Sequence, residues 1–258
     1  MKKSMDIGII AGLLFGVLSI FGSFLLEGGQ VGALILIPAM TIVFGGTFAA
    51  AIVGTPLRIF KKIGTVTRIA LFPPTFDVKS AMAQIVRFSS IARKEGLLVL
   101  EKECGKIEDP FMDKMIHFLI DGADPEVLRG MAETETHYVT ERHNRYTAIF
   151  QRMGGYSPTM GIIGTVMGLI AALASAGADP TTLIKHIGSA FIATLWGVFM
   201  ANLLWLPIAD RLKSINNDER FYMEMITQGI LEIQSGEVPT IIKAKLNSML
   251  AKSEQESA

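Results

Sequence analysis

The chain has 258 residues, half of them hydrophobic, and its basic and acidic side chains balance at 24 each. A net charge of zero gives no reason to expect a nucleic acid or a strongly acidic partner. The mean hydropathy of +0.43 is unusual for a soluble domain of this length, so the composition favours a membrane protein. Cys104 is the only cysteine, which excludes an intrachain disulfide.

Four stretches contain no Asp, Glu, Lys, Arg or His: residues 7–26, 31–57, 153–178 and 187–209. Each reaches the roughly 20 apolar residues that a helix needs to cross a hydrocarbon core of about 30 Å. Because a helix satisfies its own backbone hydrogen bonds in lipid, the pattern predicts four transmembrane helices. The alternative is four buried helices of a soluble bundle, but such helices usually keep a polar face.

The first stretch follows Lys2 and Lys3, as the apolar part of a signal peptide does. It is longer than a usual signal-peptide core, and no clear small-x-small cleavage site precedes the second stretch. We therefore expect it to remain in the protein as a membrane span.

Basic residues gather on one side of the predicted spans. Lys and Arg residues precede the first span, follow the second, precede the third and follow the fourth, whereas Glu27–Gln30 contains none and the link 179–186 contains one Lys. By the positive-inside rule, both termini and the large middle segment are cytoplasmic. The predicted organisation is two transmembrane helices in residues 1–57, a cytoplasmic helical domain in 58–152, two more in 153–209, and cytoplasmic C-terminal helices in 210–258.

The parts outside the spans read as helices, so the predicted fold class is an all-α integral membrane protein with four transmembrane helices and a helical cytoplasmic domain. Asp77 is a plausible N-cap for a helix that runs past Leu97 and is broken at residues 108–110. A short helix covers residues 111–120. Pro125, in the first turn after Asp124, starts a helix with no clear stop before the third span. Two further helices are predicted at residues 210–233 and 238–250.

Small residues recur at helical spacing in three of the spans: Gly8, Gly12, Gly16, Ser19 and Ser23 in the first, Gly164, Gly168, Ala172 and Ala176 in the third, and Ser189, Ala193, Gly197 and Ala201 in the fourth. Such stripes let membrane helices approach closely. Any single stripe fits ordinary packing within the chain. The three together favour a tight assembly with further helices, including other copies of the chain.

No charged side chain interrupts any span, although proteins that conduct ions usually carry one there for function. The polar groups inside the spans are mild: Thr41, Thr47, Thr165, Thr194 and Asn202. If the protein passes ions, the titrating carboxylate must come from a partner. The four histidines show no metal-ligand spacing, and no phosphate loop or dinucleotide fingerprint is present. We therefore expect neither an enzyme nor a metal site.

Five strings in this order resemble the MotA/PomA family of flagellar stator proteins, and together they cover nearly the whole chain. They are RKEGLLVLE at residues 93–101, YSPTMGIIGTVMG at 156–168, AFIATLWG at 190–197, LPIAD at 206–210 and GEVP at 236–239. The resemblance implies a subunit of an ion channel whose ion flow drives rotation of the flagellar motor. It also implies a location in the bacterial inner membrane.

The resemblance assigns roles by position. Arg93 and Glu101 fall on charged residues that contact the rotor protein FliG, where exposed charges of both signs can steer a partner. Pro158 and Pro207 fall on two prolines that couple ion binding to movement of the cytoplasmic part. Three positions fall on the ion path: Thr165, Thr194 and Ala193.

The partner implied by the resemblance is MotB, which has a single membrane helix and carries the essential aspartate. Five copies of the A-type subunit surround two copies of this partner, and no cofactor is implied. The ion is a proton or sodium. Thr165 resembles sodium-driven members, whereas the Ala193-Thr194 pair resembles proton-driven members, and we favour the proton.

Three alternatives differ in class. ExbB/TolQ-type subunits have three spans and a different loop order, which disagrees with four uncharged stretches and the string at residues 93–101. A secondary transporter needs broken helices or polar clusters at the membrane midplane, and none are clear in the sequence. A purely structural membrane scaffold would differ from a stator subunit because it would conduct no ions. We interpret Glu27, between the first and second spans, as an interfacial charge.

Overall fold

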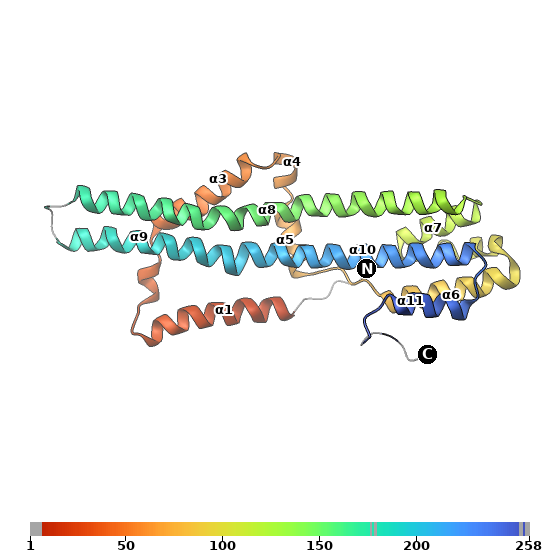
Figure 1. Ribbon diagram of the computed structural model, residues 1–258. Coiled ribbons are helices and arrows are strands. Elements are labelled where there is room, and N and C mark those ends of the chain that lie inside the picture. Colours follow the sequence, from red (N-terminus) through yellow and green to blue (C-terminus); the bar gives the residue numbers. More distant parts are fainter. Residues whose placement is uncertain (1–6, 176, 178–179, 253–254, 256–258) are drawn as a thin grey trace. The chain divides into compact units, whose positions relative to one another are not determined.

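The computed structural model describes residues 7–175, 177, 180–252 and 255. All regular elements in this part of the chain are helical, which confirms the predicted all-α fold (Figure 1). Contacts divide the chain into two compact units. We call the described residues of 4–73 and 143–214 the apolar unit, and the described residues of 74–142 and 215–258 the polar unit.

The apolar unit begins with α1 (Ile7–Leu26), followed by the single 3₁₀ turn η1 (Val31–Leu34). A 17-residue apolar helix, Ile37–Val53, comes next and consists of α2 (Ile37–Met40), the π turn η2 (Thr41–Gly45) and α3 (Gly46–Val53). The prediction of one helix over residues 31–57 is therefore wrong at both ends. Pro38 lies in the first turn of the shorter helix, and Gly54 ends it.

Two short helices, α4 (Leu57–Phe60) and α5 (Ile63–Leu71), pack within the apolar unit although they follow the second apolar stretch. Val66 and Ala70 of α5 are buried in one cluster with Phe150 and Trp205. The boundaries between the two compact units therefore differ from the predicted boundaries between membrane and cytoplasmic segments. The predicted boundaries at residues 57, 152 and 209 describe where the chain leaves or enters the membrane, and they stay a prediction.

The third and fourth apolar stretches belong to long helices. Helix α8 runs without interruption from Pro125 to Ala174, which confirms the predicted continuation into the third span. Helix α9 (Pro180–Met200) leads through the π turn η4 (Ala201–Trp205) into α10 (Leu206–Gln234). Because α9 begins at Pro180, most of the predicted link 179–186 is helical instead.

Small residues bring α8 and α9 into close contact inside the apolar unit. A Cβ atom added to Gly197 would lie 2.7 Å from the carbonyl oxygen of Ser157, and one added to Gly161 would lie 2.9 Å from that of Ala193. A Cβ on Gly168 would lie 2.9 Å from Cβ of Ala190. The described members of two predicted small-residue stripes therefore face each other within one chain, and this contact needs no second copy. Ala176, the last member of the stripe in the third span, lies outside the described residues.

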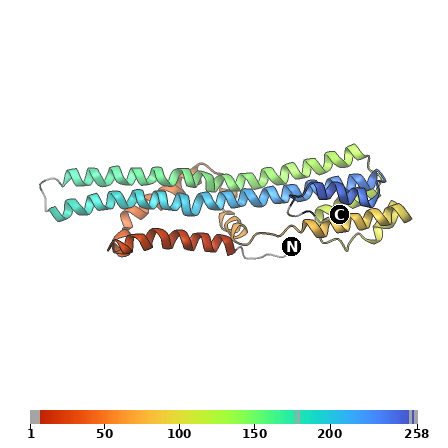
Figure 2. The same ribbon diagram turned by 60° about the horizontal axis from the view of Figure 1, so that its bottom comes forward.

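Helix α1 lies on the other side of α9 from α8, as both ribbon views show (Figures 1 and 2). It contacts α9 through aromatic side chains, with the ring centroid of Phe21 5.3 Å from that of Phe199. Its remaining surface is apolar and exposed, including Phe15 and Leu26. Three helices of the described chain are long and apolar enough to cross a membrane. They are α1, α8 and the continuous helix Pro180–Gln234, which contains α9, η4 and α10.

The polar unit contains α6 (Val78–Glu95), the 3₁₀ helix η3 (Leu97–Lys102), α7 (Pro110–Ile120) and α11 (Pro239–Ser248). The carboxylate of Asp77 accepts a hydrogen bond from the backbone nitrogen of Ser80 at 2.9 Å, which confirms the predicted N-cap. The prediction that this helix passes Leu97 is wrong. Gly96 has a φ of +88°, a conformation that glycine adopts readily and that ends α6 at Glu95.

One hydrophobic core joins the helices of the polar unit. Phe88 of α6, Ile116 of α7 and Ile226 of α10 are all at most 1% exposed within it. Gly229 lets α10 approach α6, because a Cβ there would lie 2.7 Å from the side chain of Ile85. This core fixes the helix ends from which the charged side chains of the unit project.

Candidate functional site

The polar groups of the apolar stretches fall into two kinds. Thr41 and Asn202 donate hydrogen bonds to their own helices, to the carbonyl oxygens of Ile37 at 2.8 Å and Val198 at 2.9 Å. Such bonds are ordinary for polar residues in membrane helices. Thr165 and Thr194 instead form hydrogen bonds between two helices, which distinguishes them from the other polar residues of the apolar stretches.

Thr165 and Thr194 form a hydroxyl pair between α8 and α9. The Oγ1 atoms of the two residues contact each other directly. Thr165 Oγ1 also lies 3.1 Å from the carbonyl oxygen of Gly161 in its own helix and 3.0 Å from that of Ala190 in α9. Because carbonyls only accept, Thr194 donates to Thr165 whenever Thr165 donates to either carbonyl. The pair therefore forms a short relay of oxygen atoms with no acidic group.

Ala193, which we predict to line the ion path beside this pair, is 1% exposed. A Cβ built on Gly164 would lie 2.6 Å from its side chain, so Ala193 fills the contact between α8 and α9. The structure thus gives Ala193 a spacing role next to the hydroxyl pair. The assignment of all three residues to an ion path stays a prediction.

Three more polar side-chain atoms of the apolar stretches are buried without a hydrogen-bond partner among the described residues: Thr47 Oγ1, Ser157 Oγ and Trp205 Nε1. An unpaired buried polar group costs about 1–3 kcal/mol, so such groups require a physical reason. The predicted polar residue Thr47 is thus one of several unsatisfied positions. Water or a partner group would satisfy them.

Pro158 and Pro207 lie in different local structures. Pro158 is inside α8, which continues through it, and the neighbouring Ser157 carbonyl faces Gly197. Pro207 is the second residue of α10, and only Leu206 separates it from the π turn η4. Proline lacks a backbone N–H, and π turns are frequent at functional sites. Their coupling role stays a prediction.

Arg93 and Glu101 lie on the surface of the polar unit. Arg93 is in the last turn of α6 and Glu101 is in η3, on the two sides of the turn at Gly96. Both side chains are exposed, and neither forms an ion pair within the part of the chain that the structure describes. They are therefore accessible to a partner, as a docking role requires.

Arg152 holds the end of the second apolar helix, a contact that the sequence pattern does not indicate. Its Nη1 atom donates to the carbonyl oxygen of Gly54 and lies 3.4 Å from Thr55 Oγ1. The last carbonyls of a helix have no partner within the helix and carry partial negative charge. The guanidinium therefore both caps α3 and neutralises its end.

Tyr222 and Lys245 are two polar-unit residues outside the predicted sites whose pKa is raised. Burial, and then the neighbouring Asp109, raise the pKa of Tyr222 well above its usual range, so the phenol stays neutral. A hydrogen bond to Glu232 raises the pKa of Lys245. These contacts join α10 to the start of α7 and to α11, and they serve packing.

A second unpredicted group brings together Cys104, Asp113 and His117 in the polar unit. Asp113 and His117 are four residues apart on α7, so they share one face of that helix. The sequence contains this spacing, but the search for metal sites considered only the spacings between histidines and therefore missed an Asp-His pair. Cys104 reaches the pair only through the fold.

Comparison with known proteins places the chain in a family. The model of the motility protein A N-terminal region matches residues 10–96, and the model of the MotA/TolQ/ExbB proton channel family matches residues 103–225. Motility protein A of Bacillus subtilis (strain 168) is 34% identical over 249 residues, which cover 95% of this chain and 90% of that protein.

Two solved structures agree with nearly the whole fold. A chain of C. jejuni MotAB superimposes with a TM-score of 0.92 at 30% identity, covering 98% of this chain and 99% of that one. A chain of the flagellar MotAB stator complex from Bacillus subtilis gives a TM-score of 0.89 at 30% identity, covering 95% and 96%. The chain therefore belongs to the MotA/TolQ/ExbB proton channel family, as a membrane protein of its motility protein A group.

Proposed function

We propose that this protein is the A-type subunit of a flagellar stator, which forms a cation channel with a MotB-type partner and turns the rotor. The observation that carries the proposal is the agreement of nearly the whole chain, at a TM-score of 0.92, with a MotAB subunit. An agreement of this extent includes the loop-bearing polar unit as well as the apolar helices. It favours the stator over an ExbB/TolQ-type subunit.

The proposed location is the bacterial inner membrane, with four crossings and both termini in the cytoplasm. Three long apolar helices and the 17-residue helix Ile37–Val53 supply the crossings. At 1.5 Å per residue the short helix is about 26 Å long, slightly less than a hydrocarbon core of about 30 Å. Arg152 at its end fits a position at the cytoplasmic surface.

The partner supplies the titrating group in this proposal. The apolar stretches carry no acidic residue, so an aspartate on the single membrane helix of the partner binds the ion. The hydroxyl pair of Thr165 and Thr194 offers oxygen atoms along the path. Neutralisation of the aspartate lets a ring of five A-type subunits step around two partner copies. The proton is the favoured ion, sodium is the alternative, and no cofactor takes part.

Torque reaches the rotor through the polar unit. Arg93 and Glu101 are exposed and without ion pairs in the described chain, so complementary charges on FliG can engage and release them. Pro158 and Pro207 are the proposed points where ion binding changes the geometry of the helices.

Motility rescue of a stator-null strain tests the function and the ion together. Expression with the partner should restore swimming in sodium-free medium, and replacing the partner aspartate by asparagine should abolish both swimming and proton influx. Rescue only in the presence of sodium would make sodium the ion. Ion flux in the absence of any partner would contradict the assignment of the carboxylate to the partner.

A further inference from the structure

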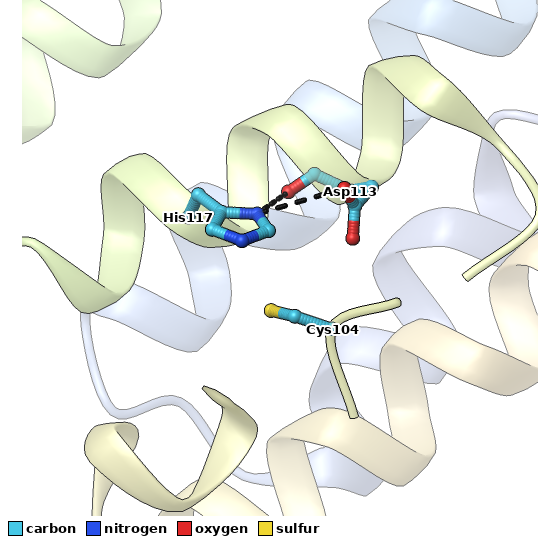
Figure 3. A group of neighbouring side chains, drawn as sticks. All are labelled: Cys104, Asp113 and His117. Atoms are coloured by element: carbon cyan, nitrogen blue, oxygen red, sulfur yellow. Dashed lines mark hydrogen bonds and ion pairs between the residues drawn. The ribbon is translucent and has the colours of Figure 1, made fainter. Parts of the chain in front are cut away.

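The cluster formed by Cys104, Asp113 and His117 has the composition of a metal site (Figure 3). One ligand atom from each residue, a sulfur, a carboxylate oxygen and an imidazole nitrogen, lies within 4.8 Å of the other two. Cys104 and Asp113 are half-buried, and His117 is exposed, so an ion can enter from solvent. No residue of the cluster belongs to the proposed ion path or rotor contact.

The imidazole of His117 is already oriented. Its Nδ1 atom lies 2.8 Å from the carbonyl oxygen of Asp113 and 3.6 Å from the carboxylate of the same residue. In the tautomer that donates from Nδ1 to this carbonyl, Nε2 keeps its lone pair. A hydrogen bond from one ring nitrogen to a carbonyl is the usual support for a histidine whose other nitrogen binds a metal.

The other two ligands are positioned by the loop between η3 and α7. Asp113 Oδ1 accepts a hydrogen bond from the backbone nitrogen of Gly105 at 3.4 Å, which holds the residue after Cys104 next to α7. Figure 3 shows the Cys104 side chain reaching toward the helix that carries the other two residues. Gly105 has a φ of +80°, so glycine is favoured at the turn that brings the thiol there.

We propose that Cys104, Asp113 and His117 bind a divalent transition ion of the zinc type, with a fourth coordination position open. Thiolate and imidazole ligands suit zinc, whereas calcium and magnesium prefer oxygen ligands only. Zinc bonds of about 2.3 Å to sulfur and about 2.0–2.1 Å to nitrogen put neighbouring donor atoms about 3.5 Å apart. The cluster therefore has to contract by at most about 1.3 Å from its present 4.8 Å.

Protons compete with the ion at this site. Burial, and then the charges of Asp113 and Glu101, raise the pKa of the Cys104 thiol above its ordinary value of 9.0. The metal binds the thiolate, so each bound ion displaces the thiol proton.

A bound ion would join the loop of residues 103–109 to α7. Glu101 lies three residues before Cys104, so the ion would also restrict the segment assigned to the rotor contact. This consequence rests on the proposed function, whereas the metal site itself does not.

Zinc binding to the full-length chain, purified from membranes in detergent and stripped with a chelator, tests the proposal. Competition with a chromophoric chelator should find one zinc ion more per wild-type chain than per chain of Cys104→Ser. Asp113→Asn and His117→Gln should each weaken binding at least tenfold. His137→Gln, which changes an exposed histidine of α8 in the same unit, is the matched control and should bind like wild type.

Cobalt(II) gives an independent readout, because a thiolate ligand adds a sulfur-to-metal charge-transfer band in the near ultraviolet. The band should appear with wild type and His137→Gln and vanish with Cys104→Ser, while circular dichroism shows equal helix content in all variants. Equal zinc uptake by all variants, or a cobalt spectrum unchanged by Cys104→Ser, would overturn the site. Neither outcome depends on motility, so the proposed function can stand or fall separately.

Discussion

Substituting Gly197 by alanine tests the close contact between α8 and α9. The added Cβ would lie 2.7 Å from the carbonyl oxygen of Ser157, and 3.4 Å is the shortest ordinary contact. The neighbour is backbone, so it cannot move away by changing a rotamer. Relief requires the two helices to separate locally by about 0.7 Å, the difference between these two distances.

Separation affects the hydroxyl pair because it lies in the same contact. A shift of about 0.7 Å would lengthen the bond between Thr165 Oγ1 and the carbonyl of Ala190 from 3.0 Å to about 3.7 Å, beyond hydrogen-bond range. Overpacking costs about 1–3 kcal/mol, and alanine returns up to about 1 kcal/mol of helix propensity. We expect Gly197→Ala to lose up to about 2 kcal/mol of stability together with ion flux.

The assay is thermal unfolding in detergent, combined with proton influx in cells that express the partner. Gly188→Ala is the matched control on the same helix, because nothing lies within 4 Å of its added Cβ. It should melt at the wild-type temperature or slightly above it. A Gly197→Ala protein that melts and conducts like Gly188→Ala would refute the argument from the helix contact.

Three further predictions concern the polar unit. Phe88→Ala should lower the free energy of unfolding by about 3–5 kcal/mol in urea titration, because Phe88 is 1% exposed, whereas Leu98→Ala, at a side chain 72% exposed, should change it little. Arg93→Glu should impair swimming with membrane assembly and ion influx intact, and the neighbouring exposed Lys94→Glu should have a smaller effect; loss of assembly would make Arg93 structural. The thiolate of Cys104 is its reactive form, and the pKa of this thiol is raised. The pH at which its alkylation by iodoacetamide reaches half the maximal rate should therefore be above 9.0, and higher than the corresponding pH for the urea-unfolded chain. A half-maximal pH at or below 9.0 would contradict the burial of the thiol.

The helices and several of their ends follow from local chemistry, so the sequence predicts them. Asp77 caps α6 as expected, and Pro125 starts a helix that continues into the third apolar stretch as far as Ala174. Gly96 also carries a local signal for a helix end, which the hydrophobic pattern through Leu97 obscures. The π turns at Thr41–Gly45 and Ala201–Trp205 have no comparable signature, because packing against other helices decides where the extra residue is inserted.

The sites depend on contacts between distant residues. The family resemblance indicates Thr165 and Thr194 separately, but their hydroxyl contact requires the relative rotation of α8 and α9. Helical spacing relates Asp113 to His117, whereas nothing local predicts that Cys104 joins them. The same limit applies to Arg152 and Gly54, which are 98 positions apart in the chain.

The short helix Ile37–Val53, which Arg152 holds at one end, has a consequence for the surrounding lipid. Val53 in its last turn is 90% exposed, so lipid meets the helix near that end. A span about 4 Å shorter than an average hydrocarbon core creates hydrophobic mismatch, which a bilayer relieves by thinning locally. With the proposed crossing, the helix cannot sink deeper without drawing the guanidinium into hydrocarbon. The insertion of this subunit should therefore depend on membrane thickness, and thicker bilayers should oppose it.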